Sequence, residues 1–300
     1  MMEDQIVLGV DIGGSHITAT LIDLKTGTSL KSRQVREPVN AKGTVSEIVS
    51  LWSSVIERAF SGHALNDKKI GIAMPGPFDY LKGIAWMKNQ DKYDSLYGLN
   101  VKELLAESLD MPAYNIRFIN DAESFLKGEV FSGVAKGTSK AIGLTFGTGL
   151  GSAKYFNGST EDADLWHTAF LDGIAEDYLS TRWFIARYST LSGEQISGVK
   201  DLAALAINDA IAMEVFREFG LNLSAFLQMI INDYEPQIIV IGGNISKAFP
   251  LFKDELHRQL HVLTNNAIIQ KAKLGEEASL IGAASCWRQV NESICSSSSV

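Results

Sequence analysis

The chain has 300 residues, of which 46% are hydrophobic and 21% are charged, and its formal net charge at pH 7 is −8. This composition is that of a globular protein, long enough for two domains of ordinary size or one large one. It excludes a membrane span, because no apolar run reaches the roughly 18 to 20 residues that cross a bilayer, and the absence of a lysine and arginine cluster argues against nucleic acid as a partner.

The N-terminus lacks the features of a secretion signal. Glu3 and Asp4 stand where a signal peptide has basic residues. The two cysteines are Cys286, in an apolar helix-like segment, and Cys295, in a serine-rich tail, and they provide neither a disulfide framework nor a metal knuckle. We therefore expect a cytoplasmic protein with no membrane partner.

The first part of the chain predicts strands mixed with helices. Strand-like runs at QIVLGV, ITATLID and KSRQVRE precede TVSEIVSLWSSVIERAF, in which apolar residues recur at helical spacing. A strand KKIGIAM then ends in the turn residues Pro75, Gly76 and Pro77. A helical segment NVKELLAESL follows, and a strand IRFI leads into Asn120 and Asp121.

The layout then begins a second time. The stretch KAIGLTFGTGLGSAKYF repeats the strand, glycine turn and returning strand of the opening VLGVDIGGSHITATLID. The spacing is preserved, since Asp11 and Gly13 stand as far apart as Thr145 and Gly147. The repeat indicates two halves with related architecture.

The remainder of the chain is mostly helical from about Gly173 to Tyr234, and a strand PQIIVI then runs into Gly242 and Gly243. A helical SLIGAASCWRQV precedes SICSSSSV, a tail that we expect to be frayed. This order predicts an α/β protein of two related domains with a cleft between them. We expect a smaller N-terminal domain at 1–119, on which a C-terminal helix at about 285–295 packs, and a larger domain at 120–284.

Three glycine-bearing turns each follow a strong strand, namely DIGGS, TFGTGLG and IGGN. A hairpin turn explains any one of them, because glycine is common where antiparallel strands reverse. Bare backbone amides in such turns also form anion-binding nests, and Thr145 and Thr148 add hydroxyl donors for phosphate oxygens. The spacing matches neither a P-loop nor a dinucleotide fingerprint, since a strand follows the first turn.

Two groups of polar residues are candidates for chemistry. Asp121 lies at the end of a strand, where it is either the N-cap of the following helix or the acceptor of a proton from a hydroxyl that is being phosphorylated. Asp164, His167 and Glu176 lie in an otherwise apolar or small span. They are either ordinary surface groups or ligands for sugar hydroxyls, which carboxylates and imidazole bind in fixed geometry.

The order of these motifs resembles the ROK family of bacterial sugar kinases and repressors, within the superfamily of actin-like ATPases. GVDIGGSHITATLID is similar to the family's first phosphate loop, GIAMPGPFD to its Pro-Gly-Pro segment and FINDAESFLKGE to its Asn-Asp segment. LTFGTGLGSA is similar to its second phosphate loop, and IIVIGGN to its adenosine segment. The resemblance covers nearly the whole chain and implies two actin-like, ribonuclease H-like α/β domains that flank a catalytic cleft.

The resemblance also implies roles for individual residues. Asp121 would be the general base, and Asp11 would hold Mg²⁺ through water. The expected sugar-binding residues are Asn89, Asn120, Asp164, His167 and Glu176. The expected ATP-binding residues are Asp11, Gly13, Gly14, Ser15, Thr145, Gly147, Thr148, Gly149, Gly242 and Gly243.

The chain departs from the family pattern around His167. In ADLWH, Asp164 stands where glutamate is usual and Trp166 where glycine is usual, and the following TAFLDGIA has no cysteine where most members carry a zinc knuckle. We therefore expect no structural zinc, because a closed zinc site needs four ligands. We expect the apolar side chains of Trp166, Phe170, Leu171 and Ile174 to hold this segment instead.

The resemblance predicts an ATP- and Mg²⁺-dependent kinase that phosphorylates a hexose hydroxyl, with the 6-hydroxyl of glucose or a related hexose as the first choice. The alternatives are an N-acetylhexosamine kinase and a non-catalytic sugar-binding regulator or transcriptional repressor. A repressor needs a DNA-binding domain, and only four residues precede the first expected strand at Gln5. The family also suggests a homodimer.

Overall fold

The computed structural model describes residues 6–62, 68–90, 92–260 and 267–288, which form two compact units. Unit 1 combines the chain up to Ser132 with the chain from Glu276 onward, and unit 2 is Gly133–Gly275. The tail with Cys295 lies outside the described residues, as does most of the helix expected at about 285–295. Within the described ranges, no helix is both long and apolar enough to cross a membrane.

Unit 1 is built on a mixed sheet that begins with a hairpin. The hairpin strands β1 (Ile6–Ile12) and β2 (His16–Asp23) are antiparallel, β1 is parallel to β5 (Ile70–Met74), and β5 is parallel to β8 (Ile116–Asn120). Two short strands, β3 (Thr28–Ser29) and β4 (Val35–Pro38), pair with the outer edge of β2. The remaining pair is β6 (Phe78–Asp79) with β7 (Ile84–Ala85).

The expected strand KSRQVRE is only partly a strand. Its first three residues form a 3₁₀ turn, η1 (Lys31–Arg33), and the strand β4 begins at Val35. The physical reason is that β3 and β4 pair with successive parts of the same strand, since Ser29 lies opposite Ile22 and Val35 lies opposite Ala19. The turn lets the chain change its path between these two pairings.

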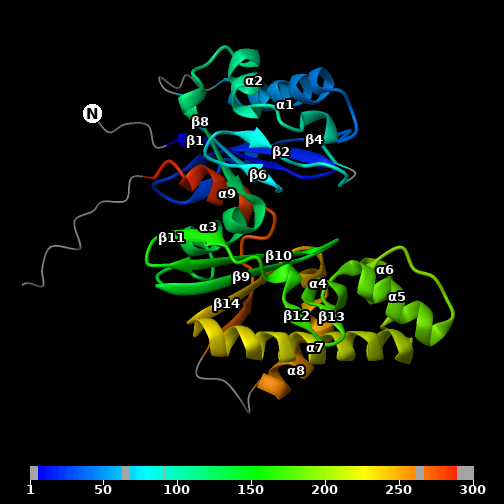
Figure 1. Cartoon of the computed structure of the whole chain (residues 1–300). Coiled ribbons are helices and arrows are strands. Elements are labelled where there is room, and N and C mark those ends of the chain that lie inside the picture. Colours follow the sequence, from blue (N-terminus) through cyan, green and yellow to red (C-terminus); the bar gives the residue numbers. More distant parts are fainter. Residues whose placement is uncertain (1–5, 63–67, 91, 261–266, 289–300) are drawn as a thin grey trace, which may run out of the picture. The chain divides into compact units, whose positions relative to one another are not determined.

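Helices cover both faces of the unit 1 sheet. On one face lie α1 (Val45–Phe60) and α2 (Val101–Ser108), and on the other lie α3 (Asp121–Ser132) and α9 (Glu277–Ser285) (Figure 1). The expected helix at TVSEIVSLWSSVIERAF is confirmed as α1, which begins with a capping box between Thr44 and Glu47 and buries Trp52 completely. Short 3₁₀ turns η2 (Asp94–Leu96) and η3 (Ala113–Asn115) complete the unit.

Glycines explain why α3 and α9 belong to unit 1. A Cβ on Gly128 of α3 would overlap the Ala278 carbonyl, and one on Gly282 of α9 would overlap the Ser124 carbonyl. The two helices therefore contact each other backbone to backbone. The unit boundary accordingly falls after Ser132, whereas the sequence predicted it at 119, and the returning helix begins at Glu277 rather than at about 285.

Unit 2 repeats this plan. An antiparallel hairpin of β9 (Lys140–Phe146) and β10 (Leu150–Phe156) has β14 (Ile238–Gly242) parallel to β9, and the sheet is completed by β11 (Ser159–Asp162) and β15 (Ile268–Lys271). The predicted repeat of strand, glycine turn and returning strand is thus confirmed. A separate pair joins β12 (Ala169–Phe170) to β13 (Gly173–Ile174).

The helical part of unit 2 packs around the 25-residue helix α7 (Ala210–Tyr234). Around it lie α4 (Ala175–Tyr178), α5 (Thr181–Ser192), α6 (Val199–Leu205) and α8 (Phe249–Leu260), with the 3₁₀ turns η4 (Leu165–His167) and η5 (Asn244–Ala248). The core is rich in aromatic side chains, and the Phe184 and Phe219 ring centroids are 4.6 Å apart.

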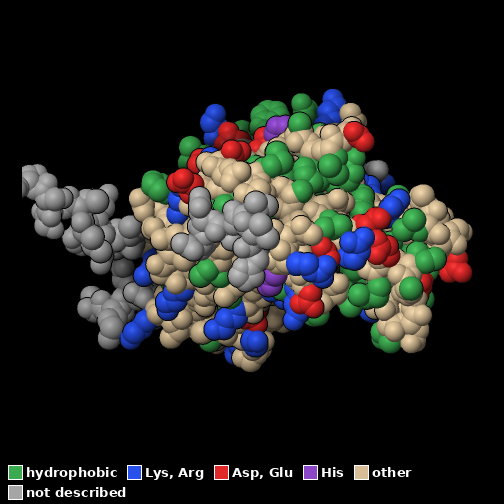
Figure 2. Space-filling model, turned by 90° about the horizontal axis from the view of Figure 1, so that it is seen from below, with side chains coloured by type: hydrophobic (Ala, Val, Ile, Leu, Met, Phe, Trp, Pro, Cys, Tyr) green, Lys and Arg blue, Asp and Glu red, His purple; other side chains and the backbone are tan. Residues whose placement is uncertain are grey.

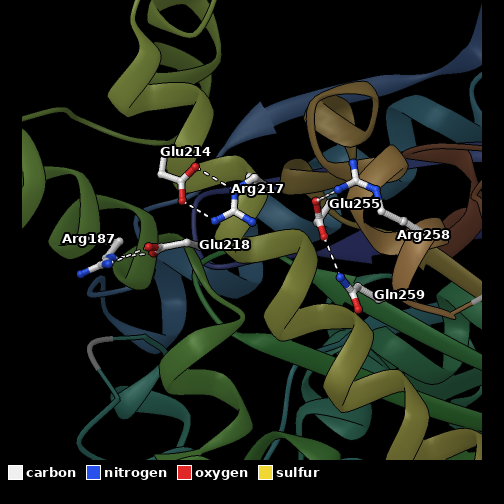
Figure 3. Close-up of polar contacts among 7 residues, drawn as sticks. All are labelled: Arg187, Glu214, Arg217, Glu218, Glu255, Arg258 and Gln259. Atoms are coloured by element: carbon white, nitrogen blue, oxygen red, sulfur yellow. Dashed lines mark hydrogen bonds and ion pairs between the residues drawn. The ribbon is translucent and has the colours of Figure 1, made fainter.

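Charged side chains fix α5 against α7. Arg187 of α5 makes two hydrogen bonds of 2.6 Å to the Glu218 carboxylate of α7, in the bidentate geometry that favours arginine (Figure 3). Further pairs in the same view, Glu214 with Arg217 and Glu255 with Arg258, lie within single helices. On the face drawn in Figure 2, basic and acidic side chains are interspersed rather than gathered in one basic stripe.

Candidate active site

The first glycine turn joins β1 to β2. It is closed by a hydrogen bond of 2.9 Å from the Gly13 N–H to the His16 carbonyl. Gly13 and Gly14 do not have the positive φ that demands glycine. The nearest atoms to an added Cβ are the His16 oxygen at 3.7 Å and Lys92 Cδ at 3.9 Å, respectively. Neither backbone conformation nor packing therefore explains these two glycines.

A buried tyrosine, Tyr93, holds this turn through a hydrogen bond to its backbone. The Tyr93 hydroxyl donates a hydrogen bond of 2.6 Å to the Gly13 carbonyl, and its ring packs edge-on against Trp52. Burial and the nearby Asp11 carboxylate raise the pKa of Tyr93, so the hydroxyl keeps its proton and remains a donor. At the exposed end of the turn, the Ser15 hydroxyl lies 3.0 Å from His16 Nδ1.

Asp11, next to this turn on β1, is held in an environment that disfavours its charge. Burial and the negative charge of Asp121 raise the pKa of Asp11 to about 7, although Arg36 opposes the shift. Two carboxyl groups that interact in this way fit a divalent cation, which binds oxygen ligands and offsets their repulsion. The predicted Mg²⁺ site at Asp11 therefore agrees with the chemistry of the residues present.

Asn120 and Asp121, at the junction of β8 and α3, differ in burial and in hydrogen bonding. The buried Asn120 side chain caps the helix, because its oxygen accepts from Ala122 N at 2.8 Å and Glu123 N at 3.2 Å, while its amide donates to the Tyr80 hydroxyl at 3.1 Å. Asp121 is exposed, and its Oδ1 also accepts from Ala122 N. The helix thus has its cap in Asn120, so capping does not account for the carboxylate of Asp121.

Asn89, the remaining sugar candidate of unit 1, lies in a loop. Its φ is +57°, and its backbone N–H donates to Asp94 Oδ2 at 3.1 Å. The side chain is exposed. Asp94 therefore fixes the backbone of this loop and leaves the amide of Asn89 at the surface.

In unit 2, the second and third glycine turns lie side by side. Thr145, before the second turn, pairs with Gly242 across the parallel strands β9 and β14. Gly243 has a φ of +77°, and a Cβ there would overlap the backbone of Phe146, so the fold itself requires this glycine. The structure thus places Thr145 and Phe146, which lead into the second turn, beside Gly242 and Gly243.

The glycines of the second turn differ from each other. Among the described residues, no atom lies within 4 Å of a Cβ built on Gly147, and its φ is not positive. A Cβ on Gly149 would lie 2.5 Å from Glu176 Oε2. A Cβ on Gly149 would therefore displace the Glu176 carboxylate, whereas one on Gly147 would enter open space and one on Gly13 or Gly14 would make only ordinary van der Waals contacts.

The predicted sugar residues of unit 2 have different hydrogen-bond partners. His167 and Asp164, joined at η4, pair with each other at 3.3 Å between Nδ1 and Oδ1, and both are more than half exposed. Glu176 contacts the second glycine turn instead, because its Oε2 accepts from Leu150 N at 3.0 Å and its Oε1 pairs with Arg182 at 2.6 Å. The backbone bond from Ala175 N to Thr168 O links the two segments.

The segment around His167 is held by fewer apolar residues than predicted. Leu165 and Phe170 are buried, and the Phe170 ring lies 5.6 Å from both Tyr178 and Phe226. Trp166 and Leu171 are 44% and 63% exposed, so the expectation that these two hold the segment is wrong. In the described part of the chain, no group of three or more histidine, cysteine, aspartate or glutamate side chains is arranged to hold a metal ion.

Sequence reasoning missed four residues that support the site, namely Tyr80 at Asn120, Tyr93 at the first glycine turn, and Thr181 and Arg182 beside the second. Thr181 donates to the Gly147 carbonyl from both its backbone N–H and its hydroxyl, each at 2.8 Å. No local pattern identifies Tyr93 or Thr181, because Gly13 and Gly147, to which they donate, lie far from them in the sequence. The only signal was their position in loops or at the start of a helix next to the recognised motifs.

Comparison with known proteins gives one family and several relatives. The family model described as "ROK family" matches residues 7–162 and 172–290. An N-acetyl-D-glucosamine kinase from Mannheimia succiniciproducens is 24% identical over 94% of this chain and 99% of its own length. A xylose repressor from Bacillus spizizenii is 23% identical over 93% of this chain and 76% of its own length. The solved structure of a ROK family glucokinase from Streptomyces griseus, in complex with glucose and AMPPNP, superposes with a TM-score of 0.74 at 22% identity, covering 94% of this chain and 98% of that one.

Proposed function

The chain belongs to the ROK family, with the actin-like ATPase fold of that family's sugar kinases, and we propose that it is an ATP-dependent sugar kinase. The proposed acceptor is the 6-hydroxyl of glucose or a related hexose. The observation that carries the proposal is that a Cβ on Gly13, Gly14 or Gly147 would clash with no protein atom, and that none of the three has a positive φ. Glycines that neither the backbone conformation nor the packing requires leave room for a ligand to approach bare amides, as nucleotide phosphates do.

Asp121 is the proposed general base. It is exposed at the N-terminus of α3, where a carboxylate can reach a bound sugar and accept the proton of its hydroxyl. Asp11 would hold Mg²⁺ through water, and the ion would supply neutralisation of the phosphate charge. Gly13, Gly14 and Ser15 in unit 1, and Thr145 and Thr148 in unit 2, would bind the phosphate oxygens.

The sugar would be bound by Asn89, Asn120, Asp164, His167 and Glu176. The exposed His167 and Asp164 side chains offer a paired imidazole and carboxylate to hydroxyl groups. Asn120 and Glu176 already have protein partners, so their contribution to the sugar would come from the remaining lone pairs and protons. N-acetylglucosamine is the second candidate, because a kinase for that sugar is among the relatives.

A coupled ADP-release assay with a panel of sugars tests the proposal. Glucose, mannose, N-acetylglucosamine and N-acetylmannosamine would be compared at equal concentration with saturating Mg²⁺ and ATP. We expect sugar-dependent ADP release with one sugar preferred. Sugar binding measured by calorimetry without turnover on any sugar would overturn the kinase proposal in favour of a non-catalytic regulator.

A further inference from the structure

The second glycine turn is held at both ends by one short segment, 176–181, which runs from α4 into the first residue of α5. At its start, the Gly147 carbonyl accepts two hydrogen bonds from Thr181, one from the backbone N–H and one from the hydroxyl, both 2.8 Å long. At its end, the Leu150 N–H donates to Glu176 at 3.0 Å. The turn closes on itself between these points through a bond of 3.0 Å from Gly147 N to Gly149 O.

The contact at the Gly147 carbonyl determines where the next amide points. A trans peptide directs its C=O and its N–H to opposite sides, and the Gly147 carbonyl shares a peptide plane with the Thr148 N–H. Because Thr181 draws the carbonyl toward α5, the Thr148 N–H is turned away from α5. Gly147, which has open space beside it, makes the approach to that amide unhindered.

The same contact also serves the helix. Thr181 is the first residue of α5, whose first amides have no partner within the helix, and the preceding Ser180 provides no side-chain cap. The Gly147 carbonyl therefore satisfies the Thr181 N–H in place of a cap. The Thr181 hydroxyl is not needed to satisfy the helix terminus. Its hydrogen bond to the Gly147 carbonyl therefore serves only to hold the glycine turn.

The carboxylate at the other end of the turn would by itself repel a phosphate. Arg182 pairs with Glu176 at 2.6 Å and offsets this charge. The Glu176 side chain is 21% exposed and that of Arg182 is 64% exposed, so the cation lies on the solvent side of the pair. The turn thus keeps its anchor at Leu150 without an uncompensated negative charge beside the amides.

We propose that Thr181 is a positioning residue for nucleotide binding, whose hydroxyl orients the Gly147–Thr148 peptide so that the Thr148 amide faces the phosphates. The Glu176–Arg182 pair fixes the opposite end of the same turn. This inference rests on the proposed function, because it assigns the second glycine turn to the nucleotide. It predicts that loss of the hydroxyl weakens nucleotide binding and leaves sugar binding unchanged.

The test compares Thr181→Val, Thr181→Ser and the wild type. Valine keeps the branched shape and removes the hydroxyl, and serine restores the hydroxyl without the methyl group. The Kd for a non-hydrolysable ATP analogue is measured by calorimetry in the presence of Mg²⁺, and KM is measured for both substrates. We expect Thr181→Val to raise the Kd and the KM for ATP by about 3- to 10-fold, the effect of one lost hydrogen bond, with the sugar KM within about twofold of wild type.

Thr190→Val is the matched control. Thr190 lies on the same helix, and its hydroxyl bonds to the Ala186 carbonyl within the helix at 2.9 Å. We expect this variant to bind the ATP analogue as the wild type does, and we expect Thr181→Ser to recover at least most of the affinity. Equal weakening by Thr190→Val, unchanged ATP affinity in Thr181→Val, or an equal rise of both KM values would overturn the inference.

Two further outcomes separate this inference from the proposed function. A wild-type protein that binds no ATP analogue would refute the proposed function and the inference with it. A wild-type protein that binds and turns over ATP, with no selective loss in Thr181→Val, would refute the inference alone. If Thr181→Val proves unfolded by circular dichroism, Arg182→Gln provides the second test, because it leaves Glu176 uncompensated and should weaken the ATP analogue more at low salt than at high salt.

Discussion

Replacing Asp121 with asparagine removes one negative charge and one proton acceptor from the start of α3 while preserving the size of the side chain. The fold should tolerate the change, because the cap of α3 is supplied by Asn120 through bonds to Ala122 N and Glu123 N. A carboxylate in the first turn of a helix contributes about 0.3–1 kcal/mol of stability. The variant loses this contribution but also loses the repulsion between Asp121 and Asp11. These effects have opposite signs, so the free energy of unfolding should change by less than about 1 kcal/mol.

Turnover should respond far more strongly. A positioned general base contributes about 10²-fold or more to the rate, and each tenfold step corresponds to about 1.4 kcal/mol of activation free energy. We therefore expect kcat of Asp121→Asn to fall by at least about 100-fold, with the Kd for an ATP analogue within a few fold of wild type. The barrier thus rises by about 3 kcal/mol while the stability changes by less than a third of that.

The measurements are coupled ADP release for kcat, calorimetry for nucleotide binding and thermal unfolding for stability. Glu123→Gln is the control, since Glu123 lies in the same first turn of α3 and loses the same charge. Its turnover should stay within about twofold of wild type. Turnover of Asp121→Asn within a few fold of wild type would show that Asp121 is not the base. An equal fall in both variants would show that Asp121 acts through the charge at the helix terminus.

Four other predictions follow from the same geometry. Gly14→Val should raise KM for ATP more than KM for the sugar, because a Cβ at this position clashes with no protein atom while the branched side chain would block the approach of a phosphate to the turn. Gly149→Ala should destabilise the protein by about 1–3 kcal/mol, since its Cβ would lie 2.5 Å from Glu176 Oε2, whereas Gly147→Ala should be neutral or slightly stabilising. In buffer without divalent cations, the free energy of unfolding of the wild type relative to Asp11→Asn should fall as the pH rises from about 4 to about 7, by up to about 1.4 kcal/mol per pH unit. The reason is that Asp11 keeps its proton up to a pKa of about 7 in the folded chain and loses it near 3.8 in the unfolded chain. Protein purified without a histidine tag should contain no stoichiometric zinc by elemental analysis, and chelation should leave its melting temperature unchanged.

Each of these predictions has an outcome that contradicts it. Equal changes in both KM values for Gly14→Val would favour a simple hairpin turn. Equal melting temperatures for Gly149→Ala and Gly147→Ala would mean that Glu176 moves aside without cost. A pH profile parallel to that of Asp11→Asn would show that Asp11 titrates alike in the folded and unfolded chain, and a zinc that chelation removes with loss of structure would invalidate the placement of His167.

The architecture was predictable because it depends on local patterns that occur twice. Hydrophobic periodicity and the equal spacing of Asp11 and Gly13 with Thr145 and Gly147 indicated the two hairpins, and the register of β9 with β14 then places Thr145 beside Gly242. The unit boundary was not predictable in the same way. It depends on backbone contact between α3 and α9, which lie far apart in the sequence and meet through Gly128 and Gly282.

The candidate site was predictable as a list of residues but not as a set of contacts. Asn120 was expected at the sugar, and the structure shows that it also caps α3 and binds the Tyr80 hydroxyl. Glu176 was grouped with His167, and the structure pairs it with Arg182 and Leu150 N instead. Tertiary packing decides which partners such side chains have. A side chain with several hydrogen-bonding atoms can bind many different groups, and the sequence alone does not indicate which of them lie nearby.

Two buried side chains anchor the segment that carries His167. Burial of a phenylalanine side chain contributes about 1.5–3 kcal/mol, and Phe170 is buried against Phe226 of α7 and Tyr178 of α4. On the other side of His167, the Leu165 side chain is buried and its N–H donates to the Ser152 hydroxyl at 2.9 Å. These two anchors lie on either side of His167 in the sequence, with Leu165 at the start of η4 and Phe170 after it. Trp166, in contrast, is 44% exposed and its ring packs edge-on against His167. Its indole therefore adds less to the core than Phe170 does, and a ligand that binds His167 would also meet the indole.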